Sequence, residues 1–370
     1  MKMLIASGGS GGHIFPATAL IDEMLKRIFS LEVIFIISGR PEEKKILNYI
    51  RKKISNIKVL TIPILPLRGK GFYNNFRFFF NFVRGAIYSF LLVLFLHPRI
   101  AVGFGGILSF PLLFSAFLLR IPTLIHEQNV YPGKANRWLS YLVNTITVSF
   151  EDSKSYFRVK DKIIFTGNPI RPDLVVMDKE TAIRKLGLNP SFFTVLILGG
   201  SQGASVINNY FLNISERIIK EKIPLQIIHI TGEKDVYRVA EKYSKLGIPA
   251  KVFSFYEDMG VLYSSADLVI GRAGASTLNE IAFFAKPAIV IPYPHAENHQ
   301  LLNALYYAQR NALFCIEEKD INDDETYFLI CDIIKNKAKR DLLSESIKKL
   351  SNPSATKLLA DAAEKLIELK

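Results

Sequence analysis

Short, unbroken runs of apolar residues recur along the whole chain, and longer stretches of helical character separate them. Apolar runs without polar alternation are typical of strands buried on both faces, as in a parallel sheet. Strand and helix repeated this often predict an α/β protein built from doubly wound sheets. The expected strands are Met3–Ala6, Val33–Ser38, Lys58–Ile62, Ile100–Gly103, Thr123–His126, Thr145–Ser149, Lys162–Thr166, Phe193–Leu198, Leu225–Ile230, Ala250–Ser254, Leu268–Gly271, Ala288–Pro292 and Ala312–Cys315.

Two of these strands run into a glycine-rich turn in the same way. Residues 3–12 read MLIASGGSGG, and residues 195–204 read VLILGGSQGA. This internal echo in a chain of 370 residues predicts two similar domains. We expect them at residues 1–168 and 169–349, with a hinge in the proline-bearing run Asn168–Pro172. The last helix, within residues 350–370, could pack on either domain.

The positive charge of the chain is concentrated in its first half. Residues 1–170 hold 22 Lys and Arg against 9 Asp and Glu, whereas residues 171–370 hold 25 of each, so the first half carries the whole net charge of +13. Such a surplus predicts an anionic partner: nucleic acid, acidic lipid or a phosphate-rich substrate. Two cysteines, Cys315 and Cys331, are too few for a disulfide framework or a cysteine-built zinc site.

An aromatic segment, residues 72–82, lies within a basic region that has no acidic residue between Lys44 and His126. Aromatics beside cations predict a membrane-interface segment, and a core helix is the alternative. Nucleic acid is not expected, because the aromatics cluster with Leu and Val rather than alternating with Lys and Arg. The clean apolar stretch that follows, Gly85–Leu96, has 12 residues, fewer than the ~20 needed to cross a bilayer. With no signal peptide, we expect a peripheral protein at the cytoplasmic face of the membrane. The predicted membrane contacts are Phe76, Phe78, Phe79, Phe80 and Phe82.

Glycine-rich turns at Gly8–Gly12 and Gly199–Gly203 are candidate phosphate sites. Such turns let backbone N–H groups approach a phosphate, and the start of the next helix adds positive potential. Tight turns with a capping residue are the alternative. The first turn does not match a dinucleotide-binding fingerprint, because Ser38, Gly39 and Arg40 stand where the second strand should end in an acidic residue.

Further polar loops follow other expected strands. Gly103–Gly106 and His126–Asn129 end strands of the first half, and ligands of doubly wound sheets sit at these carboxyl ends. A buried polar cluster is the alternative. In the second half, Arg272–Glu280 leads into a helix in which Glu280 could either cap the first turns or accept a ribose hydroxyl.

Taken together, these motifs resemble the bacterial UDP-N-acetylglucosamine–N-acetylmuramyl-(pentapeptide) pyrophosphoryl-undecaprenol N-acetylglucosamine transferases, the MurG family. The resemblance implies a GT-B fold: two Rossmann-like domains with an inter-domain cleft, the first binding the acceptor and the second UDP-GlcNAc, with the C-terminal helix packed on the first. The matching pieces, in family order, are Gly8–Pro16, Gly103–Gly106, His126–Asn129, Gly167–Arg171, Gly199–Ala204, Arg272–Glu280, and Gln300 with Asn303.

The resemblance also implies a reaction: metal-independent, inverting transfer of GlcNAc to the C4 hydroxyl of the muramyl group of lipid I, forming lipid II, with no cofactor. His13 is the expected general base because its ordinary pKa lies near neutrality, and Glu127 is the reserve. The implied UDP-GlcNAc residues are Ser10, Gly11, Gly12, Asn129, Arg171, Ser201, Tyr256, Ala275, Ser276, Thr277, Leu278, Asn279, Glu280 and Gln300. Those implied around the acceptor diphosphate are Gly8, Gly9, Gly103, Gly105, Gly106 and His126.

Two rival interpretations remain at this point. One is another GT-B enzyme with a different lipid acceptor, such as diacylglycerol. The other is a nucleotide-binding module at the membrane that binds UDP without turnover.

Overall fold

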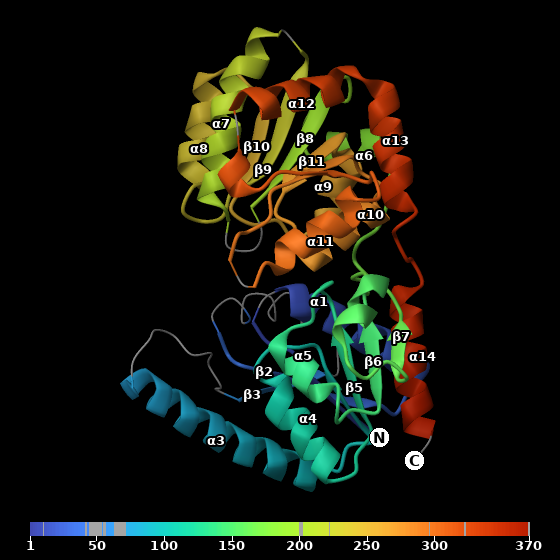
Figure 1. The fold of residues 1–370 in the computed structure, drawn as a ribbon. Helices are drawn as coiled ribbons and strands as arrows, with labels where there is room; N and C mark the ends of the chain where they lie inside the picture. The colour runs from blue at the N-terminus through green and yellow to red at the C-terminus, as the bar shows by residue number, and fades with distance from the viewer. Residues whose placement is uncertain are drawn as a thin grey trace. The chain divides into compact units, whose positions relative to one another are not determined.

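The computed structural model describes residues 1–9, 11–40, 43, 54, 57–62, 72–199, 203–221, 223–295, 297–321 and 323–368. The chain divides into two compact units (Figure 1). The first unit is Met1–Arg171 together with Asn352–Lys370, and the second is Pro172–Ser351.

A parallel seven-stranded sheet forms the centre of the first unit, in the order β3-β2-β1-β4-β5-β6-β7. The strand order reverses between β1 and β4, which is where ligands bind in doubly wound sheets. Leu4 of β1 pairs with Ile34 on one side and Ala101 on the other, and all three are buried. The strands are β1 (Lys2–Ala6), β2 (Glu32–Ile37), β3 (Ile57–Thr61), β4 (Ile100–Gly103), β5 (Thr123–Glu127), β6 (Thr145–Val148) and β7 (Ile163–Phe165).

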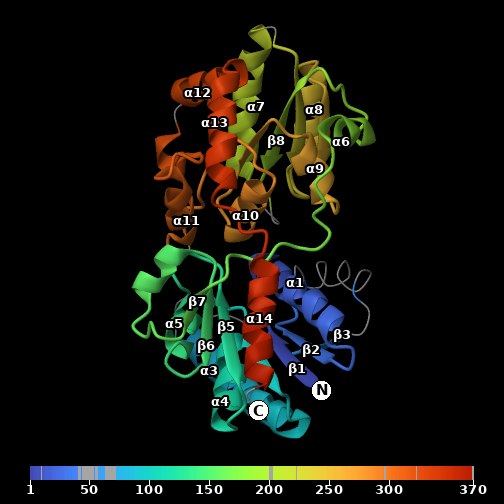
Figure 2. The same cartoon turned by 90° about the vertical axis from the view of Figure 1, so that its right-hand side faces the viewer.

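Helices cover both faces of this sheet. The C-terminal helix α14 lies beside α1, and Arg27 near the end of α1 bonds Asp361 at 2.6 Å and Glu364 at 2.7 Å (Figure 2). Leu359 and Ala363 of α14 enter the apolar core that α1 forms on β1 and β2. The helices are α1 (Gly11–Arg27), α3 (Phe72–Leu96), α4 (Ser109–Leu118), α5 (Lys134–Leu139), the 3-10 helix η1 (Glu151–Tyr156) and α14 (Ala355–Glu368).

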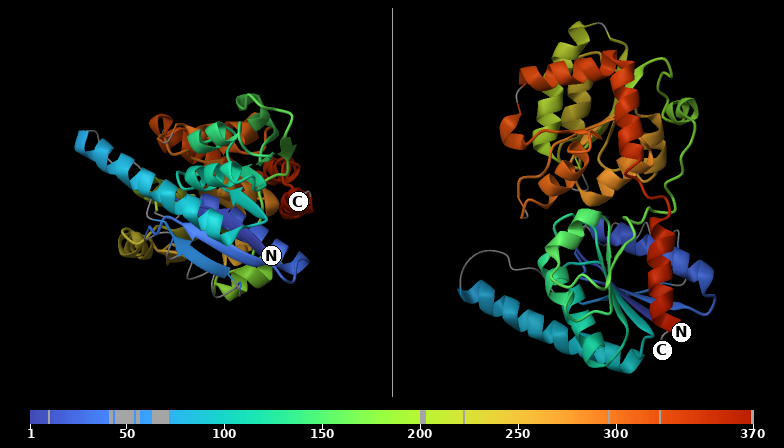
Figure 3. Two further views of the ribbon diagram at one scale, coloured as in Figure 1. Left: turned by 90° about the horizontal axis from the view of Figure 1, so that it is seen from below. Right: turned by 45° about the vertical axis from the view of Figure 1, so that its right-hand side comes forward.

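The second unit repeats this plan, with helices on both sides of a sheet (Figure 3). The sheet is parallel and six-stranded, in the order β10-β9-β8-β11-β12-β13. Its strand order reverses between β8 and β11. The strands are β8 (Phe193–Leu198), β9 (Leu225–Ile230), β10 (Ala250–Phe253), β11 (Leu268–Gly271), β12 (Ala288–Val290) and β13 (Phe314–Cys315). The helices are α6 (Lys179–Lys185), α7 (Ser205–Lys220), α8 (Val236–Lys245), α9 (Met259–Ser265), α10 (Ala275–Phe283), α11 (His299–Ala308), η2 (Glu318–Asp320, 3-10), α12 (Asp323–Lys335) and α13 (Lys337–Lys348).

The expected fold class and strands are confirmed. Each predicted strand is present, with its ends displaced by at most two residues. Both sheets are parallel throughout the described part, which explains why their strands read as unbroken apolar runs.

Candidate functional site

Three loops at the carboxyl ends of β1, β4 and β5 converge in the first unit, as the sequence predicts. A Cβ on Gly105 would lie 3.3 Å from Cε1 of His13, and one on Gly106 would lie 3.0 Å from the carbonyl oxygen of Gly8. Both glycines have positive φ, at 84° and 77°. Glycine is therefore required here for backbone conformation and for close approach to the loop after β1.

His13, in the first turn of α1, is joined to the loop after β5. Its Nδ1 lies 2.8 Å from Oε1 of Gln128. Gln128 is almost fully buried, and its Nε2 donates to the carbonyl oxygen of His126 at 3.2 Å. The sequence analysis predicted a role for His13 but none for the side chain of Gln128, which lies against its ring.

Glu127, the last residue of β5, holds the loop that follows it. Its Oε1 accepts from the backbone N–H of Asn129 at 2.9 Å and from the Asn129 amide at 3.1 Å. Its Oε2 accepts from the N–H of Gly133 at 3.0 Å and from the Asn136 amide at 2.8 Å. The carboxylate is 1% exposed, so both oxygens are committed to loop geometry.

His126 is fully buried. Thr147 donates its hydroxyl to the carbonyl oxygen of Ile125, so its oxygen accepts from Nδ1 of His126 at 3.0 Å, and Nε2 lies 3.2 Å from the hydroxyl of Ser149. Burial lowers the pKa of His126 to about 3, so the ring is neutral. The predicted contact between His126 and the acceptor diphosphate stays a prediction. The burial of the ring does not favour it.

His229 of β9 is a second buried neutral histidine, in the other unit, and burial lowers its pKa to about 3. An unfolded histidine titrates near 6.5, so below that pH the unfolded chain takes up protons that the native rings refuse. The stability that these neutral rings contribute is therefore fully present above about pH 6.5, and it is lost as the pH falls toward 3. Between pH 7 and pH 5 we expect each ring to cost about 2 kcal/mol of unfolding free energy.

Urea unfolding of His229→Gln at these two pH values should show a smaller pH dependence than the unchanged chain. His97→Asn is the control, because His97 is exposed and its φ of 43° suits asparagine. An unchanged slope in His229→Gln would contradict the assignment.

Glu43 is a site residue that the sequence analysis missed. Its Oε1 accepts from the N–H of Gly9 at 2.7 Å and from Ser38 Oγ at 2.6 Å, and its Oε2 accepts from the N–H groups of Gly39 and Arg40. The carboxylate is fully buried. An acidic residue does follow β2, but its carboxylate joins the turn after β2 to the turn after β1 and accepts from the N–H of Gly9. From the sequence alone, an acidic residue five positions after a predicted strand gives no indication of where its side chain points.

Arg171, at the end of the first unit, stacks on the first helix. Its guanidinium carbon lies 4.2 Å from the ring centroid of Phe15, and the side chain is largely buried. The arginine is thereby held beside the turn of α1 that also carries His13.

In the second unit, Gln300 joins the loops after β11 and β12. Its Oε1 accepts from the N–H of Ala273 at 3.2 Å and of Tyr293 at 3.0 Å. Arg272 reinforces the same junction, because it donates to the carbonyl oxygens of Ile291 and Pro292 and pairs with Glu318. The two neighbouring strand ends are thus held together.

Glu280 lies in α10, whose first residues are Ala275, Ser276 and Thr277. The hydroxyl of Tyr263 donates to its Oε2 at 2.9 Å, and the side chain is buried. Leu278 and Asn279 are also buried, so Leu278 faces the core. The carboxylate is oriented by Tyr263 rather than by the helix start alone.

The loop after β8 requires glycine at its last position. Gly203 has a φ of 76°, and a Cβ there would lie 2.2 Å from the carbonyl oxygen of Thr231. Tyr256, after β10, packs on Phe253 with ring centroids 4.6 Å apart, and burial raises its pKa. The predicted site residues Ser10 and Ser201 lie outside the described residues.

The remaining predicted glycines are close to these groups. Gly11 and Gly12 are the first residues of α1, and Gly9 has a φ of 106°. Gly103 ends β4 and is packed against α4, where its Cβ would lie 3.1 Å from Leu113. Among the described residues, no group of three or more His, Cys, Asp and Glu side chains could hold a metal ion.

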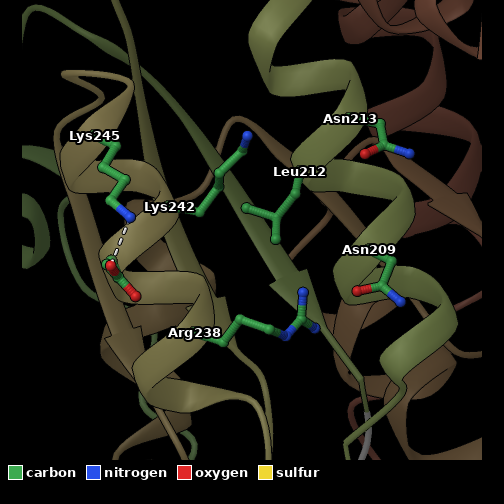
Figure 4. A pocket seen from close by; sticks show the side chains of 7 residues that line it. Asn209, Leu212, Asn213, Arg238, Lys242 and Lys245 are labelled. Carbon is green, nitrogen blue, oxygen red and sulfur yellow. Dashed lines mark ion pairs between the residues drawn. The ribbon is translucent and has the colours of Figure 1, made fainter.

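A cavity of about 320 Å³ lies between α7 and α8 in the second unit (Figure 4). It contains none of the predicted site residues, and its basic side chains are matched by acids: Lys245 pairs with Glu241, Lys242 with Glu216, and Arg238 with Asp235. It offers no unneutralised charge to an anionic substrate. Its lining residues are Asn209, Leu212, Asn213, Arg238, Glu241, Lys242 and Lys245.

An exposed apolar face extends along α3 and α4, which lie side by side (Figures 1 and 3). It is much longer than the predicted contact, which ended at Phe82. Of the predicted residues, Phe76, Phe79 and Phe80 are exposed, whereas Phe78 and Phe82 are half-buried and stack on each other. We call this surface the α3–α4 face: Phe76, Phe79, Phe80, Val83, Ile87, Tyr88, Leu91 and Phe95 of α3, with Phe114, Phe117 and Leu118 of α4.

By length and composition, residues Phe78–Leu96 of α3 could cross a membrane, and in the described part of the chain no other helix qualifies. However, α3 also has a buried side. Ser89 and Val93 are fully buried, and Phe82 contacts Phe110 of α4. The helix therefore packs on the first unit along one side and is exposed along the other.

Comparison with known proteins places this arrangement in a class. The model of the glycosyltransferase family 28 N-terminal domain matches residues 3–148, and that of the family 28 C-terminal domain matches residues 194–365. With two parallel Rossmann-like sheets, the protein is a glycosyltransferase of the GT-B fold.

Relatives over the full length define the family more narrowly. The UDP-N-acetylglucosamine–N-acetylmuramyl-(pentapeptide) pyrophosphoryl-undecaprenol N-acetylglucosamine transferase of Halalkalibacterium halodurans is 35% identical over 362 residues, covering 97% of this chain and 98% of that protein. The protein of the same name from Caldanaerobacter subterraneus is 34% identical, covering 96% and 97%. The chain belongs to this family of transferases.

Solved structures agree with this placement. The crystal structure of Acinetobacter baumannii MurG matches with a TM-score of 0.76 and 25% identity, covering 98% of this chain and 99% of that one. The Staphylococcus aureus MnaA–UDP structure matches with a TM-score of 0.69 at 14% identity, covering 100% and 97%, which shows a shared fold alone.

Proposed function

We propose that this protein transfers N-acetylglucosamine from UDP-N-acetylglucosamine to the muramyl-pentapeptide of lipid I, forming lipid II. The observation that carries the proposal is similarity across nearly the whole chain to transferases named for this reaction. The hydrogen bonds that hold the loops in place at the strand ends of both units also support it.

The test is a transfer assay with radiolabelled UDP-GlcNAc and either lipid I or diacylglycerol as acceptor. We expect labelled lipid II from lipid I, no product from diacylglycerol, and the same rate with EDTA present. UDP binding without product, or a product from diacylglycerol alone, would contradict the proposal. Loss of activity in EDTA would contradict metal independence.

The donor is proposed to bind at the strand ends of the second unit. The Glu280 carboxylate, oriented by Tyr263, suits the two hydroxyls of the ribose, and the Tyr256 backbone would meet uracil. Because Oε1 of Gln300 accepts from two backbone N–H groups, its amide NH₂ group is the part of the side chain proposed to donate to a sugar hydroxyl. Ser201 and Arg171 would meet the diphosphate.

The acceptor diphosphate is proposed to bind near the glycine loops of the first unit. His13 would accept the proton of the C4 hydroxyl while that oxygen bonds to the anomeric carbon. The bond from the anomeric carbon to the diphosphate breaks, and its electron pair leaves with UDP. N–H groups at the start of α7, together with Arg171, would stabilise the charge that grows on UDP. Glu127 is less suited to be the base, since both its oxygens already accept hydrogen bonds.

We also infer that the α3–α4 face rests on the cytoplasmic leaflet of the membrane that carries the acceptor. A large exposed apolar surface on a helix whose other side packs on its own unit is typical of a site that contacts a membrane or a partner. Exposed Arg84, Arg99 and Arg120 lie on or just beyond these two helices and would attract anionic lipid. Because its other side is buried in the first unit, α3 is proposed to lie in the interface rather than to cross the bilayer.

A further inference from the structure

Gln128 stands between His13 and the end of β5, and its two amide atoms have different partners. Its Oε1 lies 2.8 Å from Nδ1 of His13, and its Nε2 lies 3.2 Å from the carbonyl oxygen of His126. The side chain is 1% exposed, so water does not replace either partner.

The direction of the amide follows from the carbonyl. A carbonyl oxygen only accepts hydrogen bonds, so the amide atom that faces His126 must be the NH₂ group. The opposite orientation would set two oxygens against each other. The oxygen of Gln128 therefore faces His13, and because it can only accept, Nδ1 of His13 carries the proton.

The ring of His13 is also held in place sterically. A Cβ on Gly105 would lie 3.3 Å from its Cε1, and a Cβ on Gly9 would lie 4.0 Å from its Cδ2. The loops after β1 and β4 thus border the ring on two edges. Among the described residues, Nε2 has no hydrogen-bond partner.

We propose that Gln128 is a positioning residue that fixes His13 in the Nδ1–H tautomer and thereby makes Nε2 the nitrogen that accepts the proton of the sugar hydroxyl. This inference rests on the proposed function, in which His13 is the base. The neutral oxygen of Gln128 accepts the Nδ1–H bond both before and after Nε2 is protonated. Imidazole orientation by a hydrogen bond to the other ring nitrogen is a general feature of catalytic histidines.

Other charged or titratable groups of the described residues lie near the ring, among them Arg171, which stacks on Phe15. Glu43 and Arg40 lie beside Gly9, and Glu127 and His126 precede Gln128. The carboxylate oxygens of Glu43 accept from backbone N–H groups and the Ser38 hydroxyl, those of Glu127 accept from backbone and amide N–H groups, and buried His126 stays neutral. None of them takes the place of Gln128 at Nδ1.

The test combines NMR of ¹⁵N-histidine-labelled protein with the pH dependence of kcat/KM. In the unchanged protein we expect a protonated Nδ1 on His13, its signal identified by its loss in His13→Ala. In Gln128→Met the Nδ1–H population should fall, and kcat should drop about 10- to 100-fold with the KM for UDP-GlcNAc unchanged. In Gln128→Glu the carboxylate should shift the acid limb of the profile upward by about one pH unit or more.

Gln226→Met is the matched control, because Gln226 is another fully buried glutamine, bonded to Asn189 and Thr194 in the second unit. It should lose stability without moving the pH profile or the tautomer. If Gln128→Met does not fold, the unchanged protein and Gln128→Glu still decide.

An unprotonated Nδ1 in the unchanged protein, or a pH profile indifferent to Gln128→Glu, would overturn the inference. A protein that transfers no GlcNAc contradicts the proposed function instead, and the NMR result then still decides whether Gln128 fixes the tautomer.

Discussion

Replacing His13 by alanine is expected to lower kcat by about 10²- to 10⁴-fold, the range for loss of a general base. The affinity for UDP-GlcNAc should stay within about twofold, because His13 is proposed to act on the acceptor hydroxyl in the transition state and is not among the groups proposed to bind the donor. The measurements are kcat with lipid I and the Kd of UDP-GlcNAc by calorimetry. A fall in kcat without a fall in donor affinity identifies an interaction made in the transition state.

His97→Asn is the control for this experiment, because it removes an exposed histidine of the same unit at a position where asparagine tolerates the positive φ. Its kcat should equal that of the unchanged protein. Unchanged turnover in His13→Ala would remove His13 from proton transfer and leave the Gln128 hydrogen bond without a catalytic purpose.

The strands were predictable because a strand that is buried on both faces appears in the sequence as an unbroken run of apolar residues. Phe193–Leu198 reads as an apolar run whatever its neighbours are, since each of its faces meets a helix layer. The glycine turns were predictable for a related reason. A Cβ on Gly203 would collide with Thr231, so the sequence shows glycine where the backbone comes close.

The direction of polar side chains was not predictable. The motif His126–Asn129 indicates a polar loop, but three of its members act internally: His126 bonds Thr147, Glu127 bonds its own loop, and Gln128 bonds His13. Which polar group faces a ligand depends on contacts between distant segments, 115 residues apart for His13 and Gln128. Periodicity carries no information on such contacts.

The extent of the apolar face was missed for a different reason. Both sides of α3 are apolar, so composition does not tell its exposed side from the side that packs on α4. The predicted contact therefore included half-buried Phe82 and stopped short of exposed Phe95. Tertiary packing alone separates the two.

The exposed side of α3 leads to the second large effect. Replacing Phe79, Phe80 and Phe95 together by serine should weaken binding to liposomes that contain anionic lipid by about 100-fold. The three side chains are 63%, 65% and 76% exposed, so their loss removes apolar surface from the interface without opening the core. Full burial of one such side chain contributes about 1.5–3 kcal/mol, and partial insertion of three gives about 3 kcal/mol in total. Co-sedimentation with liposomes at two salt concentrations measures the change.

Phe29→Ser is the matched control, because Phe29 is fully exposed in the first unit but lies in the turn after α1, outside the α3–α4 face. Its liposome binding should stay as in the unchanged protein. The triple variant should keep its activity on UDP-GlcNAc with a water-soluble, short-chain analogue of lipid I and lose activity on lipid I in vesicles, since only the second substrate requires docking. Liposome binding that ignored both the triple substitution and the salt concentration would show that the membrane is met by another surface, and equal loss with both acceptors would mean that α3 supports the catalytic loops rather than the membrane contact.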